Sequence, residues 1–207
     1  MMSDDSFFLR DGDVVDCVDG SKTVLVDGMF LVPPSIGAKH CIDVHVTPIL
    51  SLLKGNVRIL DIGFGAGWTA SALLDECQKK NCIVEIVGVE KSAEVYSSRK
   101  NLIAPFVSHK SIRDGVSNVR IIIDDATKIV GTLGMFDSIL LDGWNEQKTP
   151  NLYSEDFLKK CFSILKNGGA ITVNTGSWNV EENLIKAGLK VETIQHQYIE
   201  SLVGWKK

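Results

Sequence analysis

The sequence predicts an α/β fold built on a mostly parallel, doubly wound sheet. From residue 57 onward, short apolar runs typical of strands alternate with amphipathic helical patterns, as expected for successive β-α units. A glycine-rich turn at 61–67 directly follows the first run, and an acidic residue, Glu90, ends the second. The 207 residues, 44% of them apolar, suffice for one such domain with a sizeable core.

The expected elements follow in order along the chain. Ser154 is typical of a helix N-cap, and Asn167-Gly168-Gly169 is typical of the left-handed C-cap that would end the same helix. The last two apolar runs, 189–194 and 197–203, lie close enough to form an antiparallel hairpin at the sheet edge. The other strands are expected at 57–62, 83–89, 119–123, 136–141 and 170–174, and the other helices at 66–79, 92–102 and 179–187.

The first fifty residues differ in character from the rest. We therefore divide the chain into an N-terminal β-hairpin extension (1–50) and a main domain (51–207). The extension contains Asp-Gly pairs, which mark turns, and two short strand-like runs that end before Pro33-Pro34. The pairs lie at 11–12, 19–20 and 27–28, and the runs at 23–26 and 29–32. We expect a small cap or lid.

Composition excludes several classes of protein. No apolar run reaches the roughly 18 to 20 residues that span a bilayer, and no secretory signal is seen, so a cytoplasmic location is expected. The net charge of −4 argues mildly against a broad nucleic-acid-binding face. The five cysteines are scattered, so we expect them to be reduced. His40 and His45 miss the i, i+4 spacing of helical metal sites, and no metal is expected.

The glycine-rich turn at 61–67 carries the first chemical signal. Glycines let the backbone approach a ligand closely, and the helix that follows points free N–H groups at that ligand. Dinucleotide enzymes also use such turns, but their third glycine falls three residues after the second, which here is Trp68 rather than Gly67. The turn contributes Asp61, Gly63, Phe64, Gly65 and Gly67 to the candidate site.

Acidic residues end the next two strands. Glu90 ends the second, where a carboxylate can accept both hydroxyls of a ribose. The third ends at Asp124-Asp125-Ala126, where Asp125 and the adjacent backbone can hold the amino edge of an adenine, and Asp124 is its solvated neighbour. Because the carboxyl ends of parallel strands meet at one edge, these groups and the glycine turn should converge on one crevice.

With these features the chain resembles the class I S-adenosylmethionine-dependent methyltransferases, over roughly residues 55 to 205. The resemblance implies a Rossmann-like fold and S-adenosylmethionine as cofactor. It also implies contacts for each part of the cofactor. The methionine end would lie on Asp61, Gly63, Gly65 and Gly67, the ribose on Glu90, and the adenine on Asp125 and Ala126.

The fourth strand ends at Asp142, which precedes Gly143 and Trp144. A carboxylate at this position faces the methyl donor, where it can bind an ammonium group and orient the deprotonated amine for in-line attack. We therefore take Asp142 as the candidate catalytic residue and nitrogen as the expected nucleophile. The alternative is that Asp142 only caps the loop that follows.

The segment 142–153 resembles the Asp-Gly-Phe…Lys-Asn-Pro…Trp motif of the MnmC-type methyltransferases, which complete 5-methylaminomethyluridine at the tRNA wobble position. Asp19-Gly20-Ser21-Lys-Thr23, the turn with Phe64, and Glu90-Lys91 resemble further motifs of that family. The resemblance implies a tRNA substrate and places Phe64 and Lys91 with the cofactor. No flavin oxidase domain, which some members carry, is expected. Trp144, Lys148 and Tyr153 are the candidate substrate residues, although Trp144 replaces Phe and Tyr153 replaces Trp. Trp144 and Tyr153 are candidates to stack on the wobble base, whereas we favour packing for Trp68 and Trp178.

Two other functions stay open. One is a small-amine methyltransferase or a spermidine-synthase-like aminopropyltransferase, which also places an acidic group after the fourth strand. The acidic net charge favours it, but the second acidic group expected after Asp142 is missing. The other is a non-catalytic cofactor-binding subunit. The sequence leaves the oligomeric state open.

Overall fold

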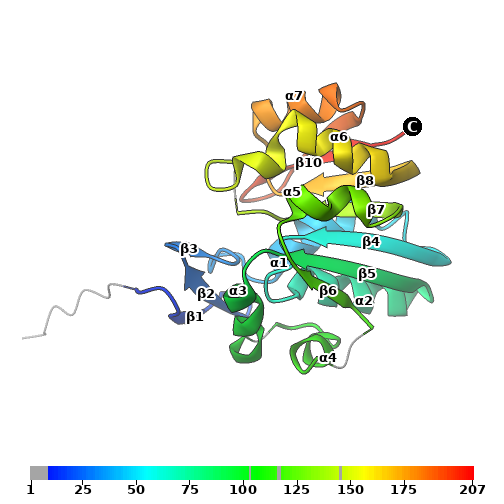
Figure 1. Ribbon diagram of the computed structural model, residues 1–207. Helices are drawn as coiled ribbons and strands as arrows, with labels where there is room; N and C mark the ends of the chain where they lie inside the picture. Colours follow the sequence, from blue (N-terminus) through cyan, green and yellow to red (C-terminus); the bar gives the residue numbers. More distant parts are fainter. Residues whose placement is uncertain (1–8, 103, 116–117, 145) are drawn as a thin grey trace, which may run out of the picture.

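A seven-stranded sheet forms the centre of the computed structural model, which describes residues 9–102, 104–115, 118–144 and 146–207 (Figure 1). In spatial order its strands are β6 (Arg120–Ile123), β5 (Ile83–Glu90), β4 (Asn56–Ile62), β7 (Phe136–Leu141), β8 (Leu165–Val173), β10 (Glu200–Trp205) and β9 (Lys190–Gln195). The first five run parallel, and β10 is antiparallel to both β8 and β9. The predicted parallel sheet with a C-terminal antiparallel hairpin is confirmed.

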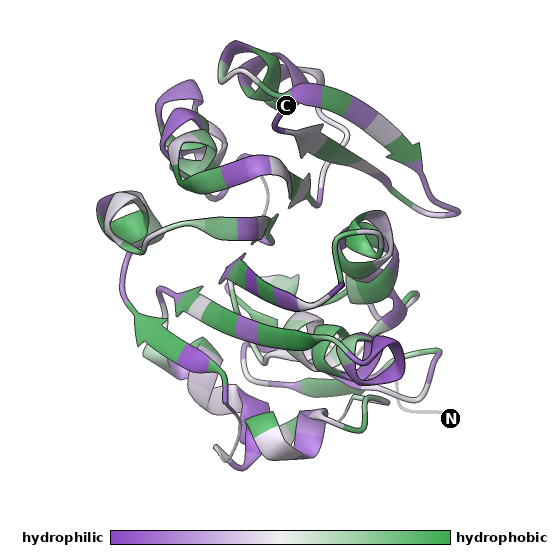
Figure 2. Ribbon diagram, turned by 90° about the vertical axis from the view of Figure 1, so that its right-hand side faces the viewer, coloured by the Kyte–Doolittle hydropathy of each residue, from purple (hydrophilic) through white to green (hydrophobic). Residues whose placement is uncertain are grey.

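Helices cover both faces of this sheet, so the sheet has an apolar core on each side. One core packs β-strands against α5 (Ala126–Ile129), α6 (Glu155–Ile164) and α7 (Trp178–Lys186). The other packs them against α2 (Trp68–Lys80) and α4 (His109–Arg113). Alternate residues of β4 serve the two cores, since Leu60 lies in the first and Ile59 in the second. Figure 2 shows that the central strands carry mostly hydrophobic residues.

The remaining helical segments are short. Ser92 caps α3 (Ala93–Ser98), where its hydroxyl accepts a hydrogen bond from the N–H of Val95 (3.1 Å). Single turns of 3₁₀ helix lie at Arg99–Asn101, Val130–Thr132 and Pro150–Tyr153.

The N-terminal region forms a separate antiparallel sheet of β1 (Val14–Asp16), β2 (Lys22–Val26) and β3 (Met29–Phe30) within the described residues. The predicted strands at 23–26 and 29–32 correspond to β2 and β3, whereas β1 was missed. Asp27 and Gly28 both have positive φ (50° and 72°), as the Asp-Gly turn signal predicts. Figure 1 shows this small sheet beside the carboxyl ends of the central strands.

A helical stretch that the sequence analysis did not foresee connects the two sheets. It consists of α1 (Lys39–Cys41), a π-helical turn (Ile42–Val46) and a 3₁₀ turn (Thr47–Ile49). Val46 and Ile49 are fully buried in the same core as β4 and α2. The predicted division at residue 50 stays a prediction; the strands of the extension end at Phe30.

The helix predicted from Ser154 begins as expected and ends earlier than expected. The Ser154 hydroxyl accepts a hydrogen bond from the N–H of Phe157 (3.3 Å), which confirms the N-cap. The predicted C-cap is wrong, because α6 ends at Ile164 and Leu165 already has extended dihedral angles. The two glycines instead lie in an irregular part of β8, where the Gly168 N–H donates to the Lys206 carbonyl (2.8 Å).

Two of the five cysteines are paired. Cys77 and Cys82 form a disulfide, with their Cα atoms 4.8 Å apart, so the expectation of reduced cysteines is wrong for this pair. The cause is local: Asn81 ends α2 in the left-handed conformation, and the chain turns back so that the Cys82 N–H donates to the Cys77 carbonyl (2.9 Å). The free cysteines Cys17, Cys41 and Cys161 are buried.

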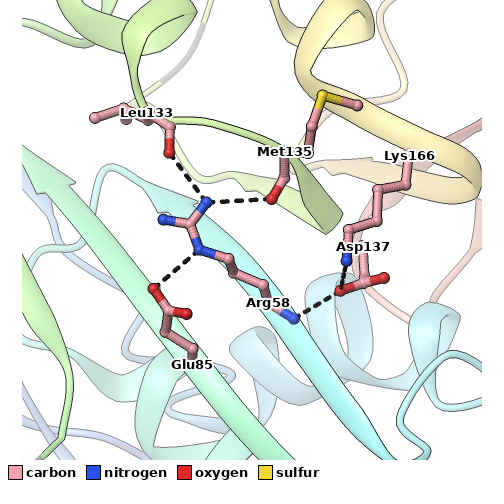
Figure 3. A network of polar contacts seen from close by, with 6 residues as sticks. All are labelled: Arg58, Glu85, Leu133, Met135, Asp137 and Lys166. Atoms are coloured by element: carbon pink, nitrogen blue, oxygen red, sulfur yellow. Dashed lines mark hydrogen bonds and ion pairs between the residues drawn. The ribbon is translucent and has the colours of Figure 1, made fainter.

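A polar network ties together the amino-terminal ends of four neighbouring strands (Figure 3). Arg58 of β4 contacts Glu85 of β5 (Nε to Oε1, 2.9 Å) and two carbonyl oxygens just before β7 (3.0 and 3.1 Å). Asp137 of β7 accepts hydrogen bonds from the Arg58 N–H (2.7 Å) and from Lys166 Nζ of β8 (2.8 Å). The network holds these strands in register at the end opposite the glycine turn.

In the part of the chain described, no helix is both long and apolar enough to cross a membrane.

Candidate functional site

A cavity of about 700 Å³ opens at the carboxyl ends of the central strands. Its walls come from segments that are far apart in the sequence: the β2–β3 hairpin, the glycine turn, the ends of β5, β6 and β7, and the loop after β7. The lining includes the predicted site residues Gly63, Phe64, Gly65, Glu90, Lys91, Asp125, Ala126, Asp142, Trp144 and Lys148. Asp61, Gly67 and Tyr153 are not among the lining residues.

The glycine turn packs closely against two neighbouring strands. The N–H groups of Gly63 and Phe64 both donate to the Val89 carbonyl of β5 (2.9 and 3.2 Å). Gly63 has a φ of 85°, and a Cβ on it would overlap the backbone oxygen of Asp142. Gly67 (φ 79°) is the N-cap residue of α2, and a Cβ there would lie 2.7 Å from the Ile112 side chain. Only glycine fits both positions.

Glu90 braces the glycine turn as well as lining the cavity. One carboxylate oxygen accepts a hydrogen bond from the Gly65 N–H (2.9 Å) and the other from the Ser92 N–H (2.8 Å). The residue is 8% exposed. Because a carboxylate oxygen can accept more than one hydrogen bond, these contacts are compatible with the predicted binding of ribose hydroxyls.

Asp61 is an unpaired carboxyl group at the end of β4. It is 1% exposed, and within the described residues neither oxygen has a hydrogen-bond partner. Burial, followed by the nearby carboxylates of Asp142 and Glu90, raises the pKa of Asp61 well above its usual value. An unpaired buried carboxyl is costly, so its presence beside the turn points to a ligand that supplies hydrogen-bond donors or positive charge.

Asp125 forms contacts within the protein that the sequence did not indicate. Its Oδ1 accepts hydrogen bonds from the N–H (3.0 Å) and hydroxyl (2.7 Å) of Thr127 and so caps α5, while Oδ2 lies 3.1 Å from Lys91 Nζ. The Thr127 hydroxyl and then Lys91 outweigh the effect of burial and lower the pKa of Asp125 to about 2. Asp124 is exposed, as expected of the solvated neighbour.

Asp142 lies in the cavity wall with its side chain 21% exposed. Its Oδ1 accepts a hydrogen bond from Asn174 Nδ2 (3.0 Å) and lies 3.5 Å from His45 Nε2. Burial would raise the pKa of Asp142, but His45, His40 and Asn174 outweigh that effect and lower it. The group is therefore a carboxylate at neutral pH.

The two histidines beside Asp142 were not found by sequence reasoning, which weighed them only as metal ligands. His45, in the π-helical turn, is fully buried, and His40, in α1, is 6% exposed and lines the cavity. Burial lowers the pKa of His40, so this imidazole is neutral at pH 7. Within the described residues no group of three or more His, Cys, Asp or Glu side chains could hold a metal ion.

The predicted substrate residues do not all lie together. Trp144 is half-buried in the cavity wall, and Lys148 lies at its exposed rim, where its ammonium donates to the Asp27 carbonyl. The prediction that Tyr153 stacks on a base is wrong, because its ring is 1% exposed in the core. Its hydroxyl donates to Asn174 Oδ1 (2.9 Å) instead.

Two other tryptophans were expected to pack in the interior. Trp68 does so, since it is 4% exposed and its ring meets that of His109 edge to face, although it also lines the cavity. Trp178 does not, since it is 70% exposed at the start of α7.

Comparison with known proteins decides the family. A family model described as S-adenosyl-L-methionine-dependent methyltransferase matches residues 90–199, more than half of the chain. The chain belongs to this methyltransferase family. The predicted cofactor, S-adenosylmethionine, is thereby confirmed at the level of the family. The cavity fits such a ligand, because Gly65 lines it and a Cβ there would meet no atom closer than 3.8 Å, while the unpaired buried carboxyl of Asp61 lies two residues before the lining residue Gly63.

Relatives of this methyltransferase are distant in sequence. An uncharacterised protein of Methanocaldococcus jannaschii is 24% identical over 197 residues, which are 86% of this chain and 54% of the relative. A protein-L-isoaspartate O-methyltransferase of Pyrococcus horikoshii is 24% identical over 152 residues, which are 73% of this chain and 58% of the relative. The chain thus spans little more than half the length of these relatives.

Solved structures share the fold of this methyltransferase. The crystal structure of MNMC2 from Aquifex aeolicus matches with a TM-score of 0.83 and 24% identity, over 94% of this chain and 70% of that one. Spermidine synthase from Thermotoga maritima matches with a TM-score of 0.64 and 17% identity, over 93% and 67% of the two chains. The predicted class I methyltransferase fold is confirmed, and the resemblance to MnmC-type proteins is confirmed at the level of the fold.

Proposed function

We propose that the protein transfers a methyl group from S-adenosylmethionine to an amine. The observation that carries this proposal is Asp142, an ionised carboxylate in the wall of the cavity, directly beside the glycine turn. When bound, S-adenosylmethionine supplies a methyl group on a positively charged sulfur, which passes to the amine nitrogen as the carbon–sulfur bond breaks and one ammonium proton is lost.

The residues around the glycine turn would hold the cofactor. Gly65 allows close approach of a ligand to the backbone, and Gly63 lets the turn pack against the end of β7. The buried Asp61 carboxyl has no hydrogen-bond partner within the described residues and would ionise beside an ammonium group at the methionine end. Glu90 would accept the ribose hydroxyls, and the segment from Asp125 would contact the adenine. Phe64, Gly67, Lys91 and Ala126 complete the proposed cofactor site.

Asp142 and His40 would serve the acceptor amine. The Asp142 carboxylate binds the ammonium form and fixes the direction from which the nitrogen approaches, and such orientation supplies several kcal/mol in catalysis. His40 lies in the same wall and is neutral, so it can take up the proton that the ammonium must lose. The acceptor nitrogen then has a free lone pair with which to attack the methyl group.

The acceptor that we propose is the aminomethyl group of a tRNA wobble uridine. The likeness to the MNMC2 structure and the motif around Asp142 support this choice. Trp144, half-buried in the cavity wall, is placed to stack on an extruded base, a contact that is worth roughly 1 to 3 kcal/mol. Lys148 would contribute at the rim of the site.

Two measurements test this function. Isothermal titration is expected to show binding of S-adenosylmethionine and none of a nicotinamide dinucleotide. Incubation with labelled methyl donor is expected to label tRNA that carries 5-aminomethyluridine, and to leave tRNA without that group unlabelled. The absence of label on any amine, with the cofactor bound, would exclude methyl transfer to nitrogen.

A small amine is the second candidate acceptor, and the likeness to spermidine synthase favours it only at the level of the fold. A polyamine mixture in the same assay separates the two. Label on polyamine and not on tRNA would replace the tRNA proposal while leaving the role of Asp142 in place.

The proposed division at residue 50 is tested separately by limited proteolysis, which is expected to cut near residue 50 if the two parts are separate domains.

The variant Asp61→Asn tests the proposed cofactor site through stability. The pKa of Asp61 is raised on folding, so the unfolded chain loses this proton first, and the free energy of unfolding falls as pH rises above about 4. Asparagine does not ionise, so the variant does not lose stability in this way as pH rises. Its melting temperature without ligand is therefore expected to exceed that of the wild type, by more at about pH 7.5 than at about pH 5.

Addition of S-adenosylmethionine is expected to raise the melting temperature of the wild type more than that of Asp61→Asn, because the variant has no carboxyl group that can ionise beside the ammonium group of the ligand. Asp156→Asn, an exposed carboxylate on α6, serves as the control. A lower melting temperature for Asp61→Asn than for the wild type at neutral pH would show that Asp61 has partners in the folded protein.

A further inference from the structure

A buried polar chain leads from β8 through His45 to the carboxylate of Asp142. Thr172 and His45 are both fully buried, and His45 Nδ1 lies 2.8 Å from Thr172 Oγ1. The other ring nitrogen, Nε2, lies 3.5 Å from Asp142 Oδ1 and forms no hydrogen bond within the described residues. The imidazole therefore stands between a hydroxyl and a carboxylate, with one nitrogen facing each.

Electrostatics favour one neutral tautomer of His45 in this buried series of polar groups. If Nδ1 of His45 carried the proton, the lone pair of Nε2 would face the Asp142 carboxylate and the two would repel each other. If the Thr172 hydroxyl donates to Nδ1, the proton lies on Nε2 and points at Asp142. Of the two neutral tautomers, only the second gives each buried group a favourable neighbour.

The consequence is a fixed orientation of the Asp142 side chain. Oδ1 faces two donors, since Asn174 Nδ2 bonds to it at 3.0 Å and His45 lies on its other side. Tyr153 in turn holds Asn174, by donating its hydroxyl to Asn174 Oδ1 (2.9 Å). With Oδ1 held from both sides, Oδ2 is the oxygen available to a ligand in the cavity.

We propose that His45, held in its Nε2–H tautomer between Thr172 and Asp142, is the positioning residue that aims the second carboxylate oxygen of Asp142 at the acceptor amine. This inference rests on the proposed function only in naming an amine as the acceptor. Neither His45 nor Thr172 lies in the cavity lining, so both act through Asp142 and do not touch the substrate.

The tautomer can be measured without activity. Long-range ¹H–¹⁵N spectra of protein labelled at histidine report which nitrogen of each ring carries the proton. We expect His45 to carry its proton on Nε2 in the wild type and in Thr172→Ser. In Thr172→Val, which lacks the hydroxyl, the Asp142 carboxylate still favours a proton on Nε2, so we expect this tautomer to remain and the Nδ1 resonance of His45 to shift. A proton on Nδ1 in the wild type, or an unchanged spectrum in Thr172→Val, overturns the proposal.

Kinetics provide the second readout. Thr172→Val is expected to lower kcat/KM for the acceptor by about tenfold, the effect of one lost hydrogen bond, with the Kd for S-adenosylmethionine unchanged. Thr172→Ser is expected to retain wild-type kinetics. Ser138→Ala is the matched control, because Ser138 is buried on the neighbouring strand, donates to the Ala170 carbonyl (2.8 Å), and within the described residues forms no hydrogen bond with Thr172, His45 or Asp142.

Failure of the proposed function and failure of the positioning role of His45 give different results. If the wild-type protein transfers no methyl group to any amine, the proposed function fails, and the spectra still decide the tautomer. If the wild type is active and Thr172→Val matches it in both kcat and KM, or if Ser138→Ala loses as much activity, the positioning role fails while the proposed function stands.

Discussion

Asp142→Asn is expected to lower kcat for methyl transfer by about 10²- to 10⁴-fold, while the Kd for S-adenosylmethionine stays within about twofold. The amide has nearly the shape of the carboxylate, so the contact with Asn174 and the packing of the loop should survive. What is lost is the negative charge that binds the ammonium form of the acceptor. Single-turnover transfer of labelled methyl and calorimetric binding of the cofactor measure the two quantities.

The control for this experiment is Asp156→Asn, which removes one negative charge from the surface of α6 and leaves the cavity unaltered. It is expected to behave as the wild type. Full turnover by Asp142→Asn would show that Asp142 only caps the loop after β7, which is the alternative that the sequence left open.

Gly63→Ala is expected to remove cofactor binding and to destabilise the protein. The φ of 85° costs a residue with a side chain roughly 1 to 2 kcal/mol. The new Cβ also overlaps the Asp142 backbone oxygen and lies 2.7 Å from its carbonyl carbon, so β4 and β7 must separate at their carboxyl ends. Such overpacking adds about 1 to 3 kcal/mol. Denaturant unfolding and calorimetry measure both effects.

Gly55→Ala separates backbone strain from the clash. Gly55 has a φ of 63° just before β4, and a Cβ on it would meet nothing within 4 Å. This variant is expected to lose only the conformational term and to bind S-adenosylmethionine as the wild type does. Equal loss of stability in both variants, with binding intact in both, would contradict the close fit between the glycine turn and the end of β7.

Local patterns were enough to predict most of the fold. The strands β4, β5, β6 and β7 lie within one or two residues of their predicted bounds, because a buried strand flanked by turn residues depends mainly on nearby apolar spacing. Local reasoning failed at Gly168, where a glycine pair after a helical pattern lies in an irregular strand. There the deciding contact is with Lys206, 38 positions further along the chain.

In the candidate site, too, some features follow from local sequence and others depend on distant contacts. Chain order alone places Gly63, Glu90 and Asp142 at one edge, since each directly ends a parallel strand or follows one. The inward turn of Tyr153 and the exposure of Trp178 depend on how the loop after β7 and the start of α7 pack, and the sequence pattern predicted both wrongly.

By itself, the sequence determined that this chain forms a parallel α/β sheet, with glycines and carboxylates gathered at the edge where we propose that S-adenosylmethionine binds. Only the tertiary structure decided that His45 meets Thr172, 127 positions away, and that the pair stands behind Asp142. The physical reason is that strand periodicity and turn chemistry act over a few neighbouring residues. Which buried polar groups meet depends instead on how separate elements pack across the sheet.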